Sequence, residues 1–244
     1  KPSKVFYGGK LVAENGKLLA DIEEKSYPLE SRNSVHVKEL TEEDFVLKAP
    51  VQEGTVKVNV MTYYDLNLSS TEAVCEELPV KDGKLDLSGD KDLKFVAVVN
   101  RYEGNDNLAL GVVRGFGTTC GALASTVSHD SHNLTIVYDD PADALITAEE
   151  LKRVGGGMCA VKDGKILHTL ELPLAGLISL KKAEDLAKDS AKMKDANRAL
   201  GLTEMENPLL RIVTLALPVI PEVKMSDLGL VDVNRKKIIP IFPA

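Results

Sequence analysis

The sequence of 244 residues contains no tryptophan, only three cysteines and four histidines, and no long uninterrupted apolar segment. Its longest apolar stretch, 212–220, includes Thr214 and Pro218 and is well short of the roughly 20 residues that a membrane-spanning helix needs. The N-terminus has no basic and apolar leader of the signal-peptide type. These absences argue against a membrane protein or a secreted protein, and we expect a cytoplasmic location.

The three cysteines, Cys75, Cys120 and Cys159, are widely spaced, and none belongs to a CxxC pair. An odd number without paired spacing is not the pattern of a disulfide framework or of a zinc site. We therefore expect reduced and mostly buried thiols, as in a protein of the cytosol.

A surplus of basic residues is also missing. Lys and Arg total 30 against 37 Asp and Glu, which gives a net charge of −7. Because a nucleic-acid-binding surface needs a concentrated basic face, this balance argues against a nucleic acid as a partner. With 44% hydrophobic and 27% charged residues, the composition is that of a folded globular protein.

Patterns of apolar residues predict both strands and helices. Strands are expected at 55–63, 93–99, 108–113, 122–127, 134–138, 211–217 and 237–241. Asp140 and Pro141 predict the start of a helix that ends at 155–157, and a hairpin follows at 158–170. A second helix is predicted from about 181 to 200, with Ala183, Leu186, Ala187, Met193 and Leu200 facing inward. No regular βαβ period is present, so the predicted class is α+β, a mixed α/β sandwich.

Turn signals divide the chain into three predicted parts. Residues 1–22 are expected to form a β-hairpin, which needs a further element to pair with because a lone hairpin is marginal in water. The polar stretch 23–38 is predicted to be a linker, and 39–244 the main domain. The chain starts at Lys1 without an initiator Met and enters a strand pattern at once. This suggests a piece of a longer protein, although a removed leader would give the same appearance.

The segment 128–133, with the sequence Ser-His-Asp-Ser-His-Asn, has the strongest signal for chemistry. Two of the four histidines lie here with a carboxylate between them, in a loop between two predicted strands. Imidazole and carboxylate groups can bind a divalent metal or transfer protons near neutral pH. The same residues are also typical of a hydrogen-bonded connector, and two histidines and one Asp leave a metal shell incomplete.

Several segments together resemble the signature of adenine deaminases, in that family's order along nearly the whole chain. They are 5–13, 111–117, 121–133, 155–157, 172–177 and 215–221. The resemblance implies a metal-dependent amidohydrolase of purine metabolism, a hydrolase that converts adenine to hypoxanthine and ammonia. It also implies that 1–22 completes a small β-domain, and that 39–244 is the family's C-terminal domain.

In that family a TIM-type barrel holds the metal, manganese or iron, partly through a His-x-His pair. This sequence has no His-x-His pair and too few histidines, and a barrel of eight β/α units alone takes about 250 residues. We therefore expect the barrel to be a missing N-terminal partner, and no metal to be bound by this chain alone. A homo-oligomer is compatible with the resemblance.

The resemblance makes His129, Asp130 and His132 candidate catalytic residues, with His129 and His132 also candidate metal ligands. Candidate substrate-binding residues, for adenine or a related purine base, are Ser128, Asn133 and Arg101. Where the family usually shows Glu-Arg-His before a Gly-Asn pair, this sequence has Asn-Arg-Tyr at 100–102. The departure suggests a divergent relative with an altered substrate.

Three hypotheses follow. In the first, the chain is the C-terminal part of an adenine deaminase and is inactive by itself. In the second, it is a stand-alone small-molecule-binding or regulatory module without catalysis. In the third, it is an enzyme with its own metal centre at His129, Asp130 and His132.

Overall fold

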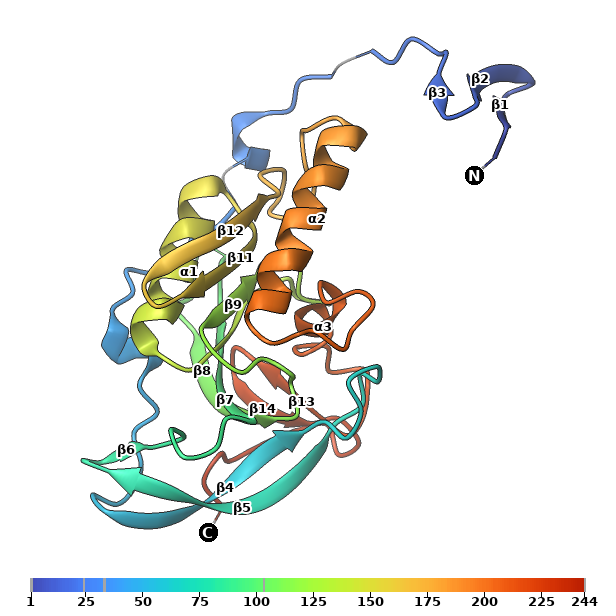
Figure 1. Ribbon diagram of the computed structural model, residues 1–244. Coiled ribbons are helices and arrows are strands. Elements are labelled where there is room, and N and C mark those ends of the chain that lie inside the picture. Colours follow the sequence, from blue (N-terminus) through green and yellow to red (C-terminus); the bar gives the residue numbers. More distant parts are fainter. Residues whose placement is uncertain (1, 24, 33, 103, 244) are drawn as a thin grey trace.

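The structure is a computed structural model that describes residues 2–23, 25–32, 34–102 and 104–243. It combines one large mixed sheet, helices on both of its faces and two small antiparallel sheets (Figure 1). The predicted α+β class, a mixed α/β sandwich, is thereby confirmed. Within the described ranges, no helix has both the length and the apolar character that crossing a membrane requires.

The large sheet has nine strands in the order β12-β11-β9-β10-β7-β8-β4-β5-β6. Their bounds are β4 (Gly54–Thr62), β5 (Glu72–Lys81), β6 (Lys84–Leu85), β7 (Leu93–Val99), β8 (Leu108–Arg114), β9 (Ala122–Ser125), β10 (Leu134–Tyr138), β11 (Gly157–Lys162) and β12 (Lys165–Glu171). Neighbouring strands are antiparallel except β4 and β8, which are parallel and pair only at Met61 with Val113 and at Thr62 with Arg114. The prediction missed β5, whose acidic residues and Pro79 hide its alternating pattern.

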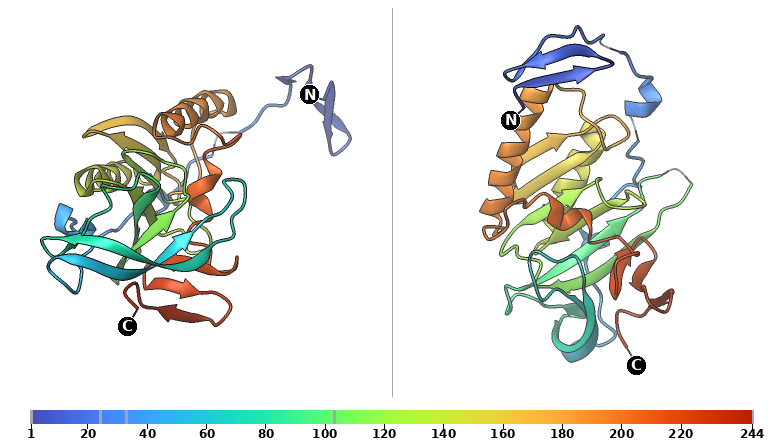
Figure 2. Two further views of the ribbon diagram at one scale, coloured as in Figure 1. Left: turned by 60° about the horizontal axis from the view of Figure 1, so that its bottom comes forward. Right: turned by 90° about the vertical axis from the view of Figure 1, so that its right-hand side faces the viewer.

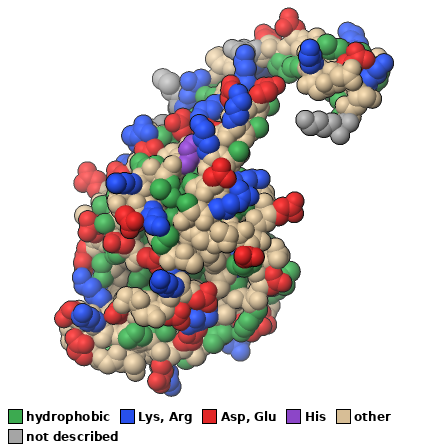
Figure 3. All heavy atoms as spheres, in the orientation of Figure 1, with side chains coloured by type: hydrophobic (Ala, Val, Ile, Leu, Met, Phe, Trp, Pro, Cys, Tyr) green, Lys and Arg blue, Asp and Glu red, His purple; other side chains and the backbone are tan. Residues whose placement is uncertain are grey.

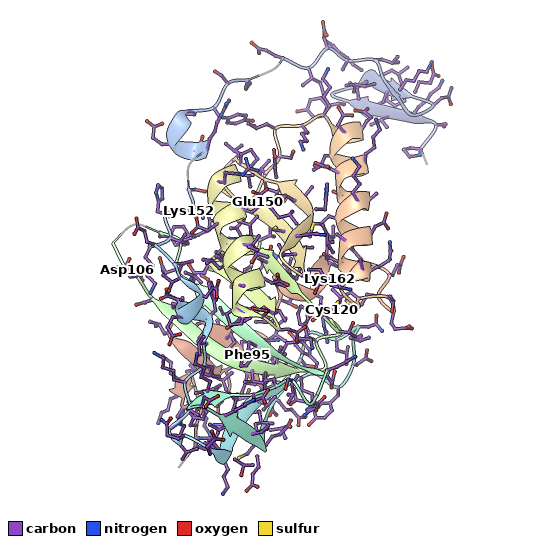
Figure 4. All side chains as sticks on the ribbon, turned by 60° about the vertical axis from the view of Figure 1, so that its left-hand side comes forward. Phe95, Asp106, Cys120, Glu150, Lys152 and Lys162 are labelled. Atoms are coloured by element: carbon purple, nitrogen blue, oxygen red, sulfur yellow. The ribbon has the colours of Figure 1, made fainter. Side chains whose placement is uncertain are left out.

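Helix α1 (Pro141–Val154) covers one face of the sheet, and α2 (Ala183–Ala199) covers the other (Figure 1). Asp140 caps α1 by accepting a hydrogen bond from the backbone N–H of Ala142 at 2.8 Å, and Gly155 ends the helix in the left-handed conformation, both as predicted. Glu150, which lies on α1 (Figure 4), accepts a hydrogen bond from the hydroxyl of Thr169 on β12 at 2.9 Å. The alternation along β7 sends Val96 and Val98 to the α2 side, so each face has its own core.

Two predictions, one on a helix and one on a strand, need correction. Ala183 and Ala187, expected to face inward, are exposed, and α2 buries Met193, Ala196 and Asn197 instead. The predicted strand 211–217 is wrong, because its first residues form the short helix α3 (Leu210–Val213) and turns follow. The branched aliphatic residues of this stretch are buried in the α2-side core, which a helix and turns achieve as well as a strand does.

The C-terminal residues form a small antiparallel sheet of β13 (Val223–Ser226), β14 (Gly229–Asp232) and β15 (Lys237–Ile239). This sheet packs closely against β8, where Gly111 leaves no room for a side chain. A Cβ atom at that position would lie 2.7 Å from the sulfur of Met225. The glycine therefore allows the small sheet to approach the large one.

The N-terminal residues form a third sheet of β1 (Lys4–Tyr7), β2 (Lys10–Glu14) and β3 (Lys17–Leu18), rather than a two-stranded hairpin. It stands apart from the main body (Figures 1 and 2). Its apolar side chains are uncovered, with Tyr7 82% and Phe6 61% exposed. Such a sheet lacks a core of its own.

The predicted linker 23–38, of which Glu24 and Asn33 lie outside the described residues, contains a 3-10 turn at Leu29–Arg32. Its last residues belong to the main body. Val35 and Val37 are buried in the core beneath α1. A second 3-10 turn, Glu42–Phe45, follows, and Asp44 accepts a hydrogen bond from the backbone N–H of Thr41 at 2.9 Å, as in a capping box.

Candidate functional site

The loop 128–133 connects β9 to β10 in the middle of the large sheet. The hydroxyls of Ser128 and Thr135, both fully buried, are 2.7 Å apart and form a hydrogen bond that fixes the base of the loop. The backbone N–H of His132 donates to the carbonyl of Ser128 at 2.7 Å, and that of His129 donates to the carbonyl of Val213 at 3.0 Å. The loop is therefore closed on itself and attached to α3.

The two histidines of this loop lie edge to face, with ring centroids 5.2 Å apart and an interplanar angle of 72°. Both are half-buried, while Asp130 and Ser131 between them are exposed. The Nδ1 atom of His132 is buried and has no hydrogen-bond partner among the described residues. Burial, then the neighbouring His129 and Arg101, lower the pKa of His132. A neutral imidazole with free hydrogen-bonding capacity is thus favoured at this position.

These residues do not by themselves fit a manganese or iron centre. In the part of the chain that the structure describes, no three His, Cys, Asp or Glu side chains are grouped so that they could hold a metal ion. Protein metal sites of this kind need at least three such ligands. We therefore assign no step to a metal held by this chain, and the role of His129, Asp130 and His132 stays a prediction.

Arg101 is the residue that brings the separate parts of the site together. Its side chain is 1% exposed, and its guanidinium donates to backbone carbonyls of three segments. Nη1 donates to the carbonyl and hydroxyl of Ser34 at 2.8 and 2.9 Å, Nη2 to the carbonyl of Ala175 at 3.0 Å, and Nε to the carbonyl of His132. These contacts favour a positioning role for Arg101, while its predicted contact with a substrate stays untested.

Asn100 and Tyr102, the neighbours of Arg101 in the sequence, contact different parts of the molecule. The Tyr102 hydroxyl donates to the carbonyl of Ser131 at 2.6 Å and so supports the loop. The side-chain amide of Asn100 donates to Asp227, 3.1 Å away in the β13–β14 turn. Asn133 is buried, and its Oδ1 atom has no partner among the described residues. Asn133 is therefore the second polar group of the loop with unused hydrogen-bonding capacity.

Two glycine-containing segments, 155–157 and 175–176, pack against each other beside the loop 128–133. A Cβ atom on Gly156 would lie 2.4 Å from the Cα atom of Gly176. The Thr126 hydroxyl joins the two segments, because it donates to the carbonyl of Gly176 at 2.6 Å and accepts from the N–H of Gly157 at 2.8 Å. The sequence indicated a helix end at 155–157 but not this close contact, which depends on residues about 20 positions further along the chain.

A second buried arginine, Arg211, which no sequence motif indicated, lies near the start of α3. Arg211 donates to five backbone carbonyls, those of Asp65, Leu66, Leu68, Gly115 and Phe116. Its guanidinium carbon lies 3.8 Å from the centroid of the Tyr63 ring. Lys224 is also fully buried and lies over the same ring, and burial lowers its pKa to about 8. Helix α3 therefore connects this buried cationic cluster to the loop 128–133.

The comparisons with known proteins all identify the same family. The sequence profile of the adenine deaminase C-terminal domain matches residues 69–237. The adenine deaminase of Moorella thermoacetica is 41% identical over 240 residues, which are 98% of this chain and 40% of that protein. Adenine deaminase 2 of Carboxydothermus hydrogenoformans is 38% identical, over 99% of this chain and 41% of that protein. The adenine deaminase of Staphylothermus marinus is 32% identical, over 99% and 40%. The chain spans about two fifths of the length of these relatives.

Proposed function

Because the chain belongs to the adenine deaminase C-terminal domain family, we propose that it serves as the C-terminal part of a hydrolase that deaminates adenine or a related purine base. The observation that carries this proposal is the coverage, since similarity extends over almost all of this chain but only two fifths of each relative. The metal, manganese or iron, and the bond-breaking step then belong to the preceding part of the enzyme. The chain itself supplies structure and a loop near the reacting base.

The loop 128–133 is the part proposed to approach the active site. His132 and Asn133 each have a buried polar atom without a partner among the described residues, and such atoms are costly unless something pairs with them. A polar ligand or a neighbouring part of the enzyme would supply that partner. Arg101 holds the loop in position through the carbonyl of His132.

The N-terminal sheet supports the same proposal. Its exposed apolar residues include Phe6, Tyr7 and Leu18, which need a covering element. In the proposed enzyme the preceding part provides that cover as a small β-domain. The enzyme would work in the cytoplasm, and neither a nucleic acid nor a membrane would be among its partners.

Two assays test the proposal. Incubated with adenine, the chain alone should release ammonia no faster than a blank, with or without added manganese, and clear turnover would contradict the assignment. A chimera in which this chain replaces the matching C-terminal part of the Moorella thermoacetica relative should deaminate adenine. A folded but inactive chimera would also contradict it.

In the same chimera, His132→Ala should lower turnover about tenfold or more if the loop contacts the reacting base. Ser131→Ala provides the matched control, because Ser131 is exposed in the same loop and the contact to Tyr102 uses its backbone carbonyl. Equal turnover in both variants would leave the loop without a role near the active site.

A further inference from the structure

A groove of about 450 Å³ lies between the N-terminal linker and the segment 174–182. Its volume is within the range of small-ligand sites, roughly 300–1,000 Å³. Its lining consists of cationic and apolar side chains with one serine: Lys25, Arg32, Lys181, Lys182, Tyr27, Leu174, Ile178, Leu180 and Ser179. None of these lining residues carries a negative charge.

The charge of this groove contrasts with that of the whole chain, which is −7. Lys181 is paired with Asp189 at 2.5 Å, so this carboxylate already neutralises one of the four cations. Lys25, Arg32 and Lys182 form no salt bridge with another residue of the described ranges. Figure 3 shows Lys and Arg side chains close together on the upper part of the main body, below the N-terminal sheet. Among the described residues, three of the four cations in the groove therefore have no carboxylate partner and can bind an anion.

Apolar surface lies next to these cations. Ile178 is 57% exposed, and Tyr27 and Leu180 are more than two fifths exposed. An inorganic anion would use the cations but leave this surface in water. A ligand with an aromatic or aliphatic body would cover it and add contact energy.

Hydrogen bonds hold both walls of the groove in place. The backbone N–H of Ala175 donates to the carbonyl of Ser31 at 2.6 Å, which joins the segment 174–182 to the linker. Leu174 and Ile178 form a backbone bridge, and the Ser179 hydroxyl accepts from the N–H of Lys181 at 3.1 Å. Because Arg101 binds Ser34 and Ala175, the same two segments also support the loop 128–133.

From this combination we infer that the groove is a binding site for a small organic anion, a phosphate or carboxylate attached to an aromatic or aliphatic body. The cations bind the anionic group, with the planar guanidinium of Arg32 suited to two oxygens at once. Tyr27, Ile178 and Leu180 contact the apolar body. This site is separate from the loop 128–133, and its occupancy does not require deaminase activity.

Titration calorimetry of the chain with phenyl phosphate tests the inference, with phenylacetate, the anion of phenylacetic acid, as the carboxylate probe. At least one of the two should bind saturably, about tenfold more tightly than inorganic phosphate, because part of its ring is buried against the apolar wall of the groove. Added salt should weaken the binding. The double variant Arg32→Gln, Lys182→Gln should weaken it by about tenfold or more. Tyr27→Ala should reduce the advantage over inorganic phosphate.

Lys188→Gln is the matched control, since Lys188 lies on α2, close in sequence to Lys182, and is exposed, but it pairs with Asp185 at 3.4 Å outside this groove. It should leave the affinity unchanged. All of the substituted side chains are at the surface, so each variant is expected to keep the melting temperature of the parent chain. The inference is overturned if neither probe binds saturably, if inorganic phosphate binds equally well, or if Lys188→Gln weakens binding as much as the double variant.

Discussion

Arg101 and Arg211 are both almost completely buried, and both donate to backbone carbonyls instead of carboxylates. The carbonyls around Arg101 come from three segments, the linker, the loop 128–133 and the turn at Ala175. Those around Arg211 come from two loops that lie side by side, 65–68 and 115–116. Arg211 also has two aromatic rings beside it, and Arg101 has one, that of Tyr102.

The difference shows that the same chemical group can serve two purposes. Arg101 lies beneath a loop whose middle residues are exposed, so it fixes the position of a surface site. Arg211 lies at the junction of β4 and β8, where Tyr63 and Gly115 follow the two parallel strands. We expect the loss of Arg211 to affect the stability of the whole domain, and the loss of Arg101 to affect mainly its site.

The largest effect is expected for Arg211→Met. It would leave five carbonyls without their donor in a buried place, and breaking such a buried charged network costs about 3–5 kcal/mol. Urea denaturation should show this loss in the free energy of unfolding. Arg198→Met is the control, because Arg198 is exposed and pairs with Asp195 on the same helix, an interaction worth about 0.5 kcal/mol. A loss below about 1 kcal/mol for Arg211→Met would contradict the expected difference between Arg211 and Arg101.

Arg101→Met should reduce the free energy of unfolding less, by about 2 kcal/mol, because its partners lie near the surface and can recruit water. The effect of Arg101→Met should be concentrated in the segments that Arg101 contacts. Hydrogen exchange should accelerate in 129–133 and 174–178 well before the strands of the sheet exchange. Uniform acceleration over the whole domain would show that the two arginines have the same role.

Lys224 should make stability depend on pH near the Arg211 cluster. Its pKa is about 8 in the folded protein because of burial and, next, the charge of Arg211, and 10.5 without these effects. Between these values the unfolded chain binds more protons than the folded one, so the free energy of unfolding should rise with pH, by about 2 kcal/mol from pH 8 to 10. Denaturation curves of the parent chain and Lys224→Met should show this rise only in the parent. Equal slopes would contradict it.

The smallest effect is expected for Tyr63→Phe. The Tyr63 hydroxyl is buried without a partner in the described part of the chain, so its removal should change stability by less than about 1 kcal/mol and can raise it. Burial raises the pKa of Tyr63 to about 12, so the parent should lose stability from pH 10 upward and the variant should lose less.

Tyr138→Phe is the paired variant. The Tyr138 hydroxyl donates to the carbonyl of Phe45 at 2.7 Å, and we expect a loss of about 1 kcal/mol at neutral pH. A larger loss at Tyr63 than at Tyr138 would mean that the Tyr63 hydroxyl has a partner in solution.

Much of the fold could be predicted because its signals are local. The strands 93–99 and 134–138 were predicted to the residue, since runs of mostly apolar residues bounded by Asp and Asn are typical of strands buried on both faces. Helix α1 was predicted from its cap, its proline and its final glycines. The prediction of a strand at 211–217 was wrong because an apolar run of that length does not distinguish a strand from buried turns.

The candidate site could be predicted only in part. The position of 128–133 between two strands was predicted, because histidine, Asp and Asn between apolar runs indicate a loop. The partners of Arg101 were not, since Ser34, His132 and Ala175 lie 67, 31 and 74 positions away along the chain. No local pattern encodes such distant contacts, and the basic groove escaped prediction for the same reason. The catalytic and substrate-binding roles of the loop residues remain predictions.

The short parallel pairing of β4 with β8 has a consequence for how the chain can be cut and rejoined. All antiparallel pairs of the large sheet lie within 54–85 or within 93–171, so only this pairing crosses between the two stretches. An opening in the intervening turn, which includes the exposed Ser88 and Gly89, would break no strand pairing. The chain can therefore be divided at this turn into two fragments for split-protein reassembly. In the intact chain, the covalent link mainly gives the two stretches a high effective concentration relative to each other.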